Sequence, residues 1–400
     1  MSKVEVKNLY KIFGPNPQKI MPLIKKGVSK KDVFEKTGHN IGVNNTTFSV
    51  EDGEMFVVMG LSGSGKSTLI RCLNRLIEPT SGEIFIDGDN IVASNKKDLI
   101  EIRRKRMAMV FQNFALLPHR TIEDNVAFGL EIQGVKPEER KTRANRALQL
   151  VGLEGYEQSM PSQLSGGMQQ RVGLARALAT DADILLMDEA FSALDPLIRK
   201  EMQDELLSLQ VKMHKTIIFI THDLDEALKI GDRIAIMRDG EIVQIGTPED
   251  ILKNPANDYV KEFVQDVNRA RVVTAASIMK HADILVRSKE GVLVAVRRMN
   301  EASISSIFVV NKNRQLEGII TIDDATNQIK AHRDGIEEIL NRDVEMVSPD
   351  TLIKDLIPLF LNTQYPLVVV DEESRILGII FKASVLAGIV GEEEASDAVS

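Results

Sequence analysis

The sequence predicts an α/β protein with a large N-terminal domain followed by a smaller α/β domain. Short apolar runs such as MFVVMG, DILLMDE and TIIFITH alternate with longer amphipathic stretches up to about Gly246. Runs that are apolar on every face are typical of strands in a sheet that helices cover on both sides. Further along, two similar segments follow each other about 60 residues apart, as in a tandem repeat of one small unit.

Length and composition exclude several classes of protein. The 400 residues leave room for two or three domains. A formal net charge of -8 argues against a protein that coats nucleic acid, and we expect no nucleic-acid partner. The single cysteine, Cys72, excludes an intrachain disulfide and a cysteine zinc cluster. No apolar run reaches the roughly 18 residues of a membrane span and no signal peptide is recognisable, so we expect the chain to stay inside the cell.

Changes of pattern along the chain predict four segments. The alternation of apolar runs and amphipathic stretches ends near residue 250, and the run NPANDYVKEFVQDVN that follows does not continue it. In the repeat, SIFVVNKNRQLEGIITIDDA resembles YPLVVVDEESRILGIIFKAS, each with a β run, a polar turn, a glycine and a second β run. The last ten residues are acidic. We predict a first domain over 1–250, a linker over 251–268, a tandem module over 269–390 and an acidic tail over 391–400.

A glycine-rich turn is the strongest motif. The stretch GLSGSGKST, Gly60–Thr68, matches G-x-x-x-x-G-K-[ST] and lies between an apolar run and a helical pattern, the context that this motif requires. Glycines let the backbone N–H groups converge on phosphate oxygens, and the helix start adds positive partial charge. Lys66 would reach the β- and γ-phosphates and Ser67 would ligate Mg²⁺. We predict ATP and Mg²⁺ as cofactors, with ATP contacts from Gly60, Ser62, Gly63, Ser64, Gly65, Lys66, Ser67 and Thr68.

Two carboxylates end a later apolar run, ILLMDE, which spans Ile184–Glu189. Asp188 at the strand end is placed to hold Mg²⁺, as such an aspartate does in P-loop NTPases. The next side chain, Glu189, is then free to orient and polarise the water that attacks the γ-phosphate. The alternative is an acidic pair that is merely solvated at the surface, and the P-loop in the same chain argues against it.

The stretch LSGGMQQRVGLARAL, Leu164–Leu178, makes a family recognisable. Its LSGG-x-Q pattern, which includes Gln169, resembles the signature of ABC ATPases. Ser165, Gly166 and Gly167 offer a hydroxyl and backbone N–H groups at a helix start, which suits an anion. In that family the signature and the P-loop face opposite ways. The resemblance therefore implies a helical subdomain and a homodimer that clamps two ATP molecules.

Further residues follow in the order of that family. Gln112 in VFQNFALLP resembles the glutamine that contacts Mg²⁺ and faces the membrane partner. Asp195 in SALD resembles the loop that crosses the dimer interface, and His222 in ITHD resembles the histidine that bonds the γ-phosphate. Phe13 in KIFG resembles the aromatic residue that stacks on adenine. The resemblance thus implies Glu189, His222 and Gln112 as catalytic residues, Ser67, Gln112 and Asp188 as metal ligands, and Phe13, Ser165, Gly166, Gly167, Gln169 and Asp195 as further ATP contacts.

Longer strings narrow the resemblance. VMGLSGSGKSTLIRCLNRLIEPTSG, LLMDEAFSALDPLIRKEMQDELL and the insertion after KIFG resemble the ATPase subunit of glycine betaine/proline betaine importers. This implies a homodimer at the cytoplasmic face of the membrane, bound to integral permease subunits and, through them, to a substrate-binding protein or domain. Importers of another solute, and soluble ABC ATPases of DNA repair or translation, are the alternatives. The single uninterrupted cassette argues against the soluble classes.

The C-terminal repeat resembles a tandem CBS module, which implies osmotic regulation. Thr321 and Asp324 in GIITIDDA resemble the Thr-x-x-Asp that grips a ribose, whereas Phe381 and Ser384 occupy those places in the second repeat. An adenosine nucleotide or a cyclic dinucleotide is the expected ligand, and a structural dimerisation cap is the alternative.

Two basic stretches lie in the first domain, at Lys19–Lys36 and Lys96–Arg106. Near an anionic leaflet, each lysine or arginine would contribute on the order of 1 kcal/mol, and salt would screen that attraction. The alternative is that both stretches are solvated charged faces.

Overall fold

A computed structural model describes residues 2–112, 114–192, 194–265, 269–363 and 365–390. Contacts between residues divide the chain into two compact units, Met1–Gln265 and Asp266–Ser400. The predicted acidic tail over 391–400 lies outside the described residues. None of the helices in the described ranges has the length and hydropathy that crossing a bilayer requires.

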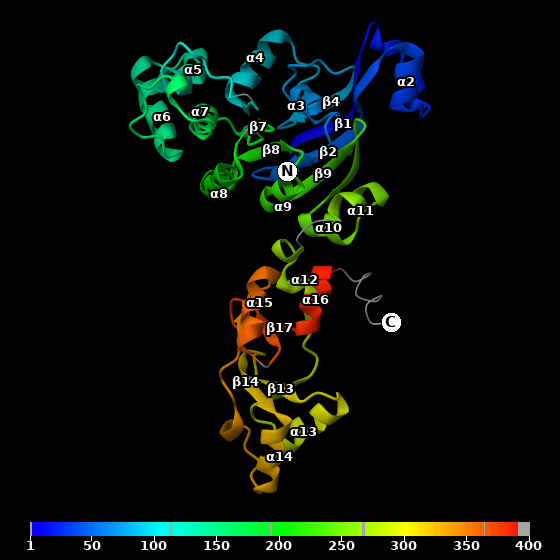
Figure 1. The fold of residues 1–400 in the computed structure, drawn as a ribbon, viewed down its shortest axis with the longest axis vertical. Coiled ribbons are helices and arrows are strands. Elements are labelled where there is room, and N and C mark those ends of the chain that lie inside the picture. The colour runs from blue at the N-terminus through cyan, green and yellow to red at the C-terminus, as the bar shows by residue number, and fades with distance from the viewer. Residues whose placement is uncertain (1, 113, 193, 266–268, 364, 391–400) are drawn as a thin grey trace. The chain divides into compact units, whose positions relative to one another are not determined.

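The first unit is built on a six-stranded sheet (Figure 1). Its strands, in spatial order, are β10 (Glu241–Gly246), β9 (Arg233–Arg238), β3 (Met55–Met59), β8 (Thr216–Thr221), β7 (Ile184–Asp188) and β6 (Met107–Val110). All neighbours pair in parallel except β10 with β9. Every residue of β3, β7 and β8 is buried, as expected for a parallel sheet covered on both faces. The predicted α/β class is confirmed.

A second, antiparallel sheet belongs to the same unit. Its strands, in spatial order, are β2 (Asn40–Glu51), β1 (Ser2–Phe13), β4 (Ser81–Ile86) and β5 (Asp89–Asn90). Helix α3 (Lys66–Leu73) shares one hydrophobic core with both sheets. The rings of Phe48 on β2 and Phe56 on β3 stack there at 5.1 Å between centroids. This packing fixes the first turn of α3 at the edge where the parallel strands end.

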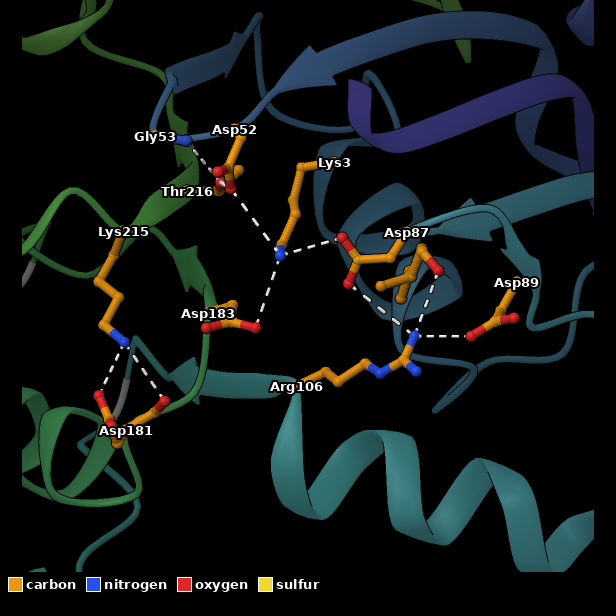
Figure 2. Close-up of polar contacts among 11 residues, drawn as sticks. Lys3, Asp52, Gly53, Asp87, Asp89, Arg106, Asp181, Asp183, Lys215 and Thr216 are labelled. Atoms are coloured by element: carbon orange, nitrogen blue, oxygen red, sulfur yellow. Dashed lines mark hydrogen bonds and ion pairs between the residues drawn. The ribbon is translucent and has the colours of Figure 1, made fainter. Parts of the chain in front are cut away.

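A polar network reinforces the joint between the sheets (Figure 2). The Lys3 ammonium on β1 lies 3.0 Å from Asp87 and 3.5 Å from Asp183, the residue just before β7. Burial lowers the pKa of Lys3, but these carboxylates and Asp52 outweigh it, and the pKa is raised. Lys3 therefore stays charged and holds the antiparallel sheet to the parallel one at neutral pH.

The remaining helices of the first unit cover the sheets or form a separate group. Helices α5 (Ile122–Ile132), α6 (Pro137–Leu150) and α7 (Gly166–Ala179) pack on one another and form a helical subdomain (Figure 1). The others are α4 (Lys96–Lys105), α8 (Pro196–Met213) and α9 (Leu224–Ile230), with a 3-10 turn η2 (Pro161–Gln163) before α7. Serine and threonine cap the subdomain: Thr121 accepts from an N–H of α5, and Ser165 from one of α7.

The segment after Phe13 is an insertion with its own small core. It contains η1 (Pro17–Lys19), α1 (Met21–Lys25) and α2 (Lys30–Thr37). Ile24 and Val33 are buried there against Ile12 and Ile41 of the β1–β2 pair. The apolar contacts explain why a lysine-rich stretch nevertheless folds onto the sheet.

Within the predicted linker over 251–268, the described residues 251–265 contain the end of one helix and the whole of another. Helices α10 (Pro248–Lys253) and α11 (Asp258–Val264) belong to the first unit. Thr247 and Asn257 cap them by accepting hydrogen bonds from backbone N–H groups. Each helix buries two apolar side chains, namely Ile251 and Leu252 in α10 and Val260 and Val264 in α11. Both helices are short and amphipathic. The polar residues between them made the whole stretch look like a linker in the sequence.

The second unit contains two copies of one small α/β arrangement. The first copy has β12 (Leu285–Arg287), α13 (Val292–Glu301), β13 (Ser306–Val310), β14 (Leu316–Thr321) and α14 (Ile322–Lys330). The second has β15 (Met346–Val347), α15 (Ile353–Asn362), β16 (Leu367–Val370), β17 (Ile376–Ile380) and α16 (Lys382–Val390), with β11 (Lys280–His281) added to its sheet. The remaining elements are η3 (Arg269–Arg271), α12 (Ala275–Ile278) and η4 (Glu337–Ile339).

Hydrogen bonds between backbone groups join the two copies at the turn that precedes the last strand of each copy. Leu316 N–H donates to Ser374 at 3.1 Å, and Ile376 N–H donates to Arg314 at 3.1 Å. A shared cluster that includes Phe308 and Val368 is buried between the copies. The repeat seen in the sequence therefore folds as one body in which each copy covers the other.

Cys72 on α3 provides a test of this core. Its side chain is fully buried, and burial raises the pKa of the thiol to about 12. Because the thiolate is the reactive form, we expect a thiol reagent at pH 8 to label the native chain at least about 1000-fold more slowly than the unfolded chain. Absorbance of the released chromophore measures both rates. Rapid stoichiometric labelling of the native chain would contradict the packing of α3.

Candidate active site

The glycine-rich turn lies between β3 and α3. The backbone at Met237 and the backbone at Gly42 pack against it. Gly60 and Gly65 have positive φ angles of 151° and 109°. A Cβ atom at Gly60 would overlap the carbonyl oxygen of Met237, and one at Gly65 would overlap that of Gly42. Only glycine fits at these two points, and the loop is held in a narrow curve with the start of α3 behind it.

Lys66, the first residue of α3, is a buried cation. Only 4 % of its side chain is exposed. Its ammonium donates to the carbonyls of Gly60 at 2.8 Å and Leu61 at 3.1 Å, and lies 3.9 Å from Glu189 Oε1. Burial lowers the pKa of Lys66, while the carboxylates of Glu189 and Asp188 act in the opposite direction. One carboxylate at 3.9 Å compensates a buried charge incompletely, so the site favours a further anion.

Asp188, the last residue of β7, is buried and faces α3. It accepts a hydrogen bond from Ser67 Oγ at 2.9 Å and one from Arg71 Nη2 at 3.2 Å. The sequence reasoning missed Arg71, although its spacing of four residues from Ser67 places both on one helix face. The oxygens of Ser67 and Asp188 fit Mg²⁺, a hard cation that prefers oxygen. Among the described residues no group of three or more metal-binding side chains gathers, so such an ion would need oxygens from phosphate and water as well.

Glu189 lies at the centre of three neighbouring strand ends. Gln112 follows β6, Glu189 follows β7 and His222 follows β8, and these strands are adjacent in the sheet. Gln112 Nε2 donates to Glu189 Oε2 at 3.2 Å, and His222 Nδ1 lies 3.6 Å from the same oxygen. The backbone of Glu189 has a φ of 47°, a left-handed conformation that costs a non-glycine residue on the order of 1 kcal/mol. The fold thus accepts strain to aim this carboxylate.

Comparisons with known proteins are consistent with this arrangement. Residues 43–192 match the model of the ABC transporter family, and residues 275–331 and 336–391 match that of the CBS domain. The chain is 56 % identical over 393 residues to a glycine betaine/carnitine transport ATP-binding protein of Listeria monocytogenes, covering 98 % of this chain and 99 % of that one. It is 50 % identical to the glycine betaine/proline betaine transport ATP-binding protein ProV of Salmonella typhimurium, covering 97 % of each.

The chain belongs to the ABC transporter ATP-binding subunits, and it carries a tandem CBS domain. Among solved structures, the dimeric bacterial ABC transporter cassette MJ0796 covers 61 % of this chain and 98 % of its own, with 32 % identity and a TM-score of 0.53. A post-hydrolysis state of that cassette is bound to ADP and Pi, at the same identity and TM-score. The ABC ATPase identity predicted from the signature is therefore confirmed.

The ABC signature caps a helix and leaves its polar groups open. Ser165 is exposed and accepts from Met168 N–H at 3.4 Å, and Gly166 is the exposed first residue of α7. A Cβ at Gly167 would lie 2.7 Å from Ile198, so that glycine lets α7 approach α8. Gln169 is oriented inward, and its amide donates to the carbonyls of Pro161 at 3.0 Å and Leu164 at 3.1 Å. It shapes the turn before the helix, a contact that the motif did not predict.

The SALD segment lies beside the central carboxylate. Ser192 Oγ donates to the backbone oxygen of Glu189 at 2.9 Å, and Gln112 Nε2 reaches Ser192 Oγ at 3.3 Å. Ala193 lies outside the described residues. Asp195 caps α8 and accepts from Ile198 N–H at 3.1 Å. In this chain Ser192 is the member of the segment that contacts Glu189 and Gln112, and the ATP contact expected of Asp195 stays a prediction.

Phe13 ends β1 next to the glycine turn. Gly42 separates its ring from Thr68 of α3, since a Cβ at Gly42 would lie 2.8 Å from the ring and 2.9 Å from Thr68. The ring is 39 % exposed and has the Lys11 ammonium 5.0 Å from its centroid. An exposed aromatic face near a phosphate loop suits stacking with a base. Within the loop, the buried Ser64 Oγ has no hydrogen-bond partner among the described residues, and it is available to a bound ligand or water.

In the CBS unit, Thr321 and Asp324 bond to each other. Thr321 Oγ1 lies 2.6 Å from Asp324 Oδ2 and accepts from the Asp324 N–H at 3.1 Å, which caps α14. A cavity of about 860 Å³ in this unit is lined by other residues. Its charged lining residues are three arginines, Arg287, Arg298 and Arg314, and three carboxylates, Asp283, Glu290 and Glu301. Arg298 pairs with Glu290 at 2.7 Å.

Replacing Glu189 with glutamine tests the role of the central carboxylate. An amide of the same size cannot polarise water, so we expect kcat for ATP hydrolysis to fall by about 100-fold or more, as for loss of a general base. The affinity for ATP should stay within a few-fold of wild type, because the P-loop contacts remain. Phosphate release and equilibrium dialysis with labelled ATP measure the two quantities.

Glu201→Gln is the matched control, because Glu201 is an exposed residue of α8 away from the strand ends. It should leave both quantities unchanged. Turnover by Glu189→Gln within threefold of wild type would show that another group activates the water.

Proposed function

We propose that this ABC ATPase powers a membrane importer for glycine betaine or related quaternary amines. The observation that carries the proposal is identity over nearly the whole length, CBS unit included, to ATP-binding proteins named for glycine betaine transport. The alternative is an importer for another solute: a trimethylamine N-oxide transport system ATP-binding protein of Pelagibacter ubique is 49 % identical over 79 % of this chain.

The site residues divide the chemistry of phosphoryl transfer among them. The N–H groups of Gly60–Thr68 and the Lys66 ammonium bind the β- and γ-phosphates and compensate the negative charge that these phosphates bring into the site. Ser67 and Asp188 would hold Mg²⁺, which when bound neutralises charge on the phosphate oxygens. Glu189 orients the attacking water and accepts its proton. Gln112 and His222, both next to Glu189 Oε2, fix the direction of that carboxylate.

A second copy of the chain is the proposed partner of the signature. Ser165 and Gly166 are exposed at the start of a 14-residue helix, and their polar groups suit a phosphate brought by another subunit. The dimeric assembly of the cassette MJ0796 supports this arrangement. ATP then favours the closed dimer through contacts that exist only there, and hydrolysis removes them.

The other proposed partners are integral permease subunits and, through them, a substrate-binding protein or domain. We place the dimer on the cytoplasmic face of the membrane as a peripheral subunit, in keeping with relatives named as transport-system components. Many basic side chains of the insertion and of α4 are exposed to solvent. This exposure fits both interpretations of these segments, namely contact with an anionic leaflet and a solvated charged face.

Reconstitution tests the importer. The chain and its permease are placed in liposomes that contain ATP, and uptake of labelled glycine betaine, carnitine, choline and proline is compared. We expect ATP-dependent uptake of glycine betaine with wild type and none with Glu189→Gln. Uptake of proline alone, which has no quaternary nitrogen, would favour the alternative, and hydrolysis unaffected by any permease would contradict the importer.

We also propose an anionic nucleotide, an adenosine nucleotide or a cyclic dinucleotide, as the ligand of the CBS unit. The support is that Arg287 and Arg314 line this cavity in addition to Arg298, which pairs with Glu290, and guanidinium groups bind phosphate in a bidentate manner. This site differs from the one predicted at Thr321 and Asp324. Their mutual bonds belong to a helix cap in this structure, and the ribose-gripping role expected of them stays a prediction.

Variants of the cavity test this ligand. In the full-length chain, Arg287→Gln and Arg314→Gln should each weaken binding of cyclic di-AMP or AMP by about 10-fold, the loss expected for one charge-assisted contact. Titration calorimetry measures the affinity. Thr321→Val should have a smaller effect on affinity. A lack of binding at millimolar ligand would favour the dimerisation cap instead.

A further inference from the structure

The guanidinium of Arg199 holds the backbone of the turn between β7 and α8. Arg199 is the fourth residue of α8, and its side chain reaches back to the turn that precedes the helix. Its Nε donates to the carbonyl of Phe191 at 3.3 Å, and its Nη2 donates to those of Ser192 at 3.5 Å and Leu194 at 3.1 Å. Because the N–H donors of a guanidinium lie in one rigid plane, this single side chain sets the relative positions of three carbonyls.

The same guanidinium contacts the turn that follows β8. Its Nη1 donates to Asp223 Oδ2 at 3.4 Å. The other oxygen of this carboxylate, Oδ1, accepts from the Glu226 N–H at 3.1 Å and so caps α9. Strands β7 and β8 are neighbours in the sheet. Arg199 therefore joins the turns that follow two adjacent strands.

Each of these two turns is next to a group of the candidate active site. Ser192 Oγ donates to the backbone oxygen of Glu189 at 2.9 Å, so the β7–α8 turn contacts the residue that carries the central carboxylate. Asp223 directly follows His222, whose Nδ1 lies 3.6 Å from Glu189 Oε2. The distance between Glu189 and His222 thus depends on the separation of two turns, and Arg199 is bonded to both.

The direction of these hydrogen bonds matters more than the charge of the guanidinium. The Arg199 side chain is 28 % exposed, so water screens its attraction to Asp223. The Phe191 ring also ties the β7–α8 turn to β8, since it lies 5.5 Å from the ring of Phe219. An apolar contact of that kind is non-directional, whereas hydrogen bonds to carbonyls fix the orientation of the backbone.

We propose that Arg199 is a positioning residue for ATP hydrolysis, which holds the turns after β7 and β8 together so that His222 and Glu189 stay in contact. The inference rests on the proposed role of Glu189 in orienting the attacking water. A small misplacement of a catalytic group costs up to about 100-fold in rate. Because Arg199 contacts the two turns, whereas Gly60–Thr68 hold the phosphates, its loss should affect the chemical step more than nucleotide binding.

Arg199→Met removes the guanidinium and keeps much of the aliphatic side chain. In the full-length chain we expect kcat for ATP hydrolysis to fall about 10-fold, with KM and the affinity for ATP within about twofold of wild type. In a His222→Ala background, the same substitution should lower kcat by less than about twofold further, because the contact that Arg199 maintains is already lost. Phosphate release measures kcat and KM, and equilibrium dialysis with labelled ATP measures the affinity.

Two results would show that Arg199 has only a general structural role. One is a further fall in kcat of about 10-fold in the His222→Ala background, because independent effects add. The other is a loss of ATP affinity as large as the loss in kcat.

Asp223→Asn is a milder second variant, which keeps the proposal testable if Arg199→Met does not fold. An asparagine retains one oxygen for the cap of α9 but has none left for Arg199. We therefore expect kcat to fall about threefold at unchanged KM, the effect of one hydrogen bond.

Lys200→Met is the control, because Lys200 is the exposed next residue of α8. It should change neither kcat nor KM. If Arg199→Met and Asp223→Asn hydrolyse ATP as fast as wild type while Glu189→Gln does not, the positioning role is wrong and the active site stands. If Glu189→Gln also keeps its turnover, the role of Glu189 is wrong, and that of Arg199 falls with it.

Discussion

The first unit depends on a buried ammonium group, that of Lys66, at a place where several elements end together. A charge with 4 % exposure is tolerated only if oxygens surround it, and the carbonyls of the glycine turn and the Glu189 carboxylate supply them. Those oxygens can be brought there only if β3, β8 and β7 are neighbours and α3 is fixed in the shared core. The strained backbone of Glu189 and the close approach of Met237 to Gly60 follow from the same requirement.

This constraint links the parts of the molecule that act on nucleotide. Gln112 and His222 reach Glu189 from the two strands that flank β7. The position of this one carboxylate therefore depends on the ends of three strands. On the other side of the loop, Lys30 of the insertion and Gly240 in the β9–β10 turn hold the carbonyls of Gly63 and Ser64. The loop therefore contacts the sheet that carries the catalytic residues on one side, and the insertion and the β9–β10 turn on the other.

Sequence reasoning predicts the parts of the site that a short motif encodes, and misses those that depend on strand order or side-chain direction. Ser67 and Asp188 are predictable because carboxyl ends of parallel strands meet at one edge. Gln112, 77 positions from Glu189, is placed beside it only by the β6–β7 pairing, for which the residues gave no signal apart from family resemblance. Gln169 and Asp195 bond to backbone in this chain, and Thr321 and Asp324 bond to each other, so the ligand contacts expected of them stay predictions. The helices in the predicted linker were missed because each is barely two turns long.

If the buried Lys66 charge is completed by a phosphate that a second signature covers, then ATP must join two chains. Sedimentation equilibrium of the Glu189→Gln chain with Mg-ATP, and without nucleotide, tests this directly. The account predicts a mass of 44.5 kDa without nucleotide and twice that with ATP. A single-chain mass in both conditions, at ATP concentrations that saturate the site, would contradict it.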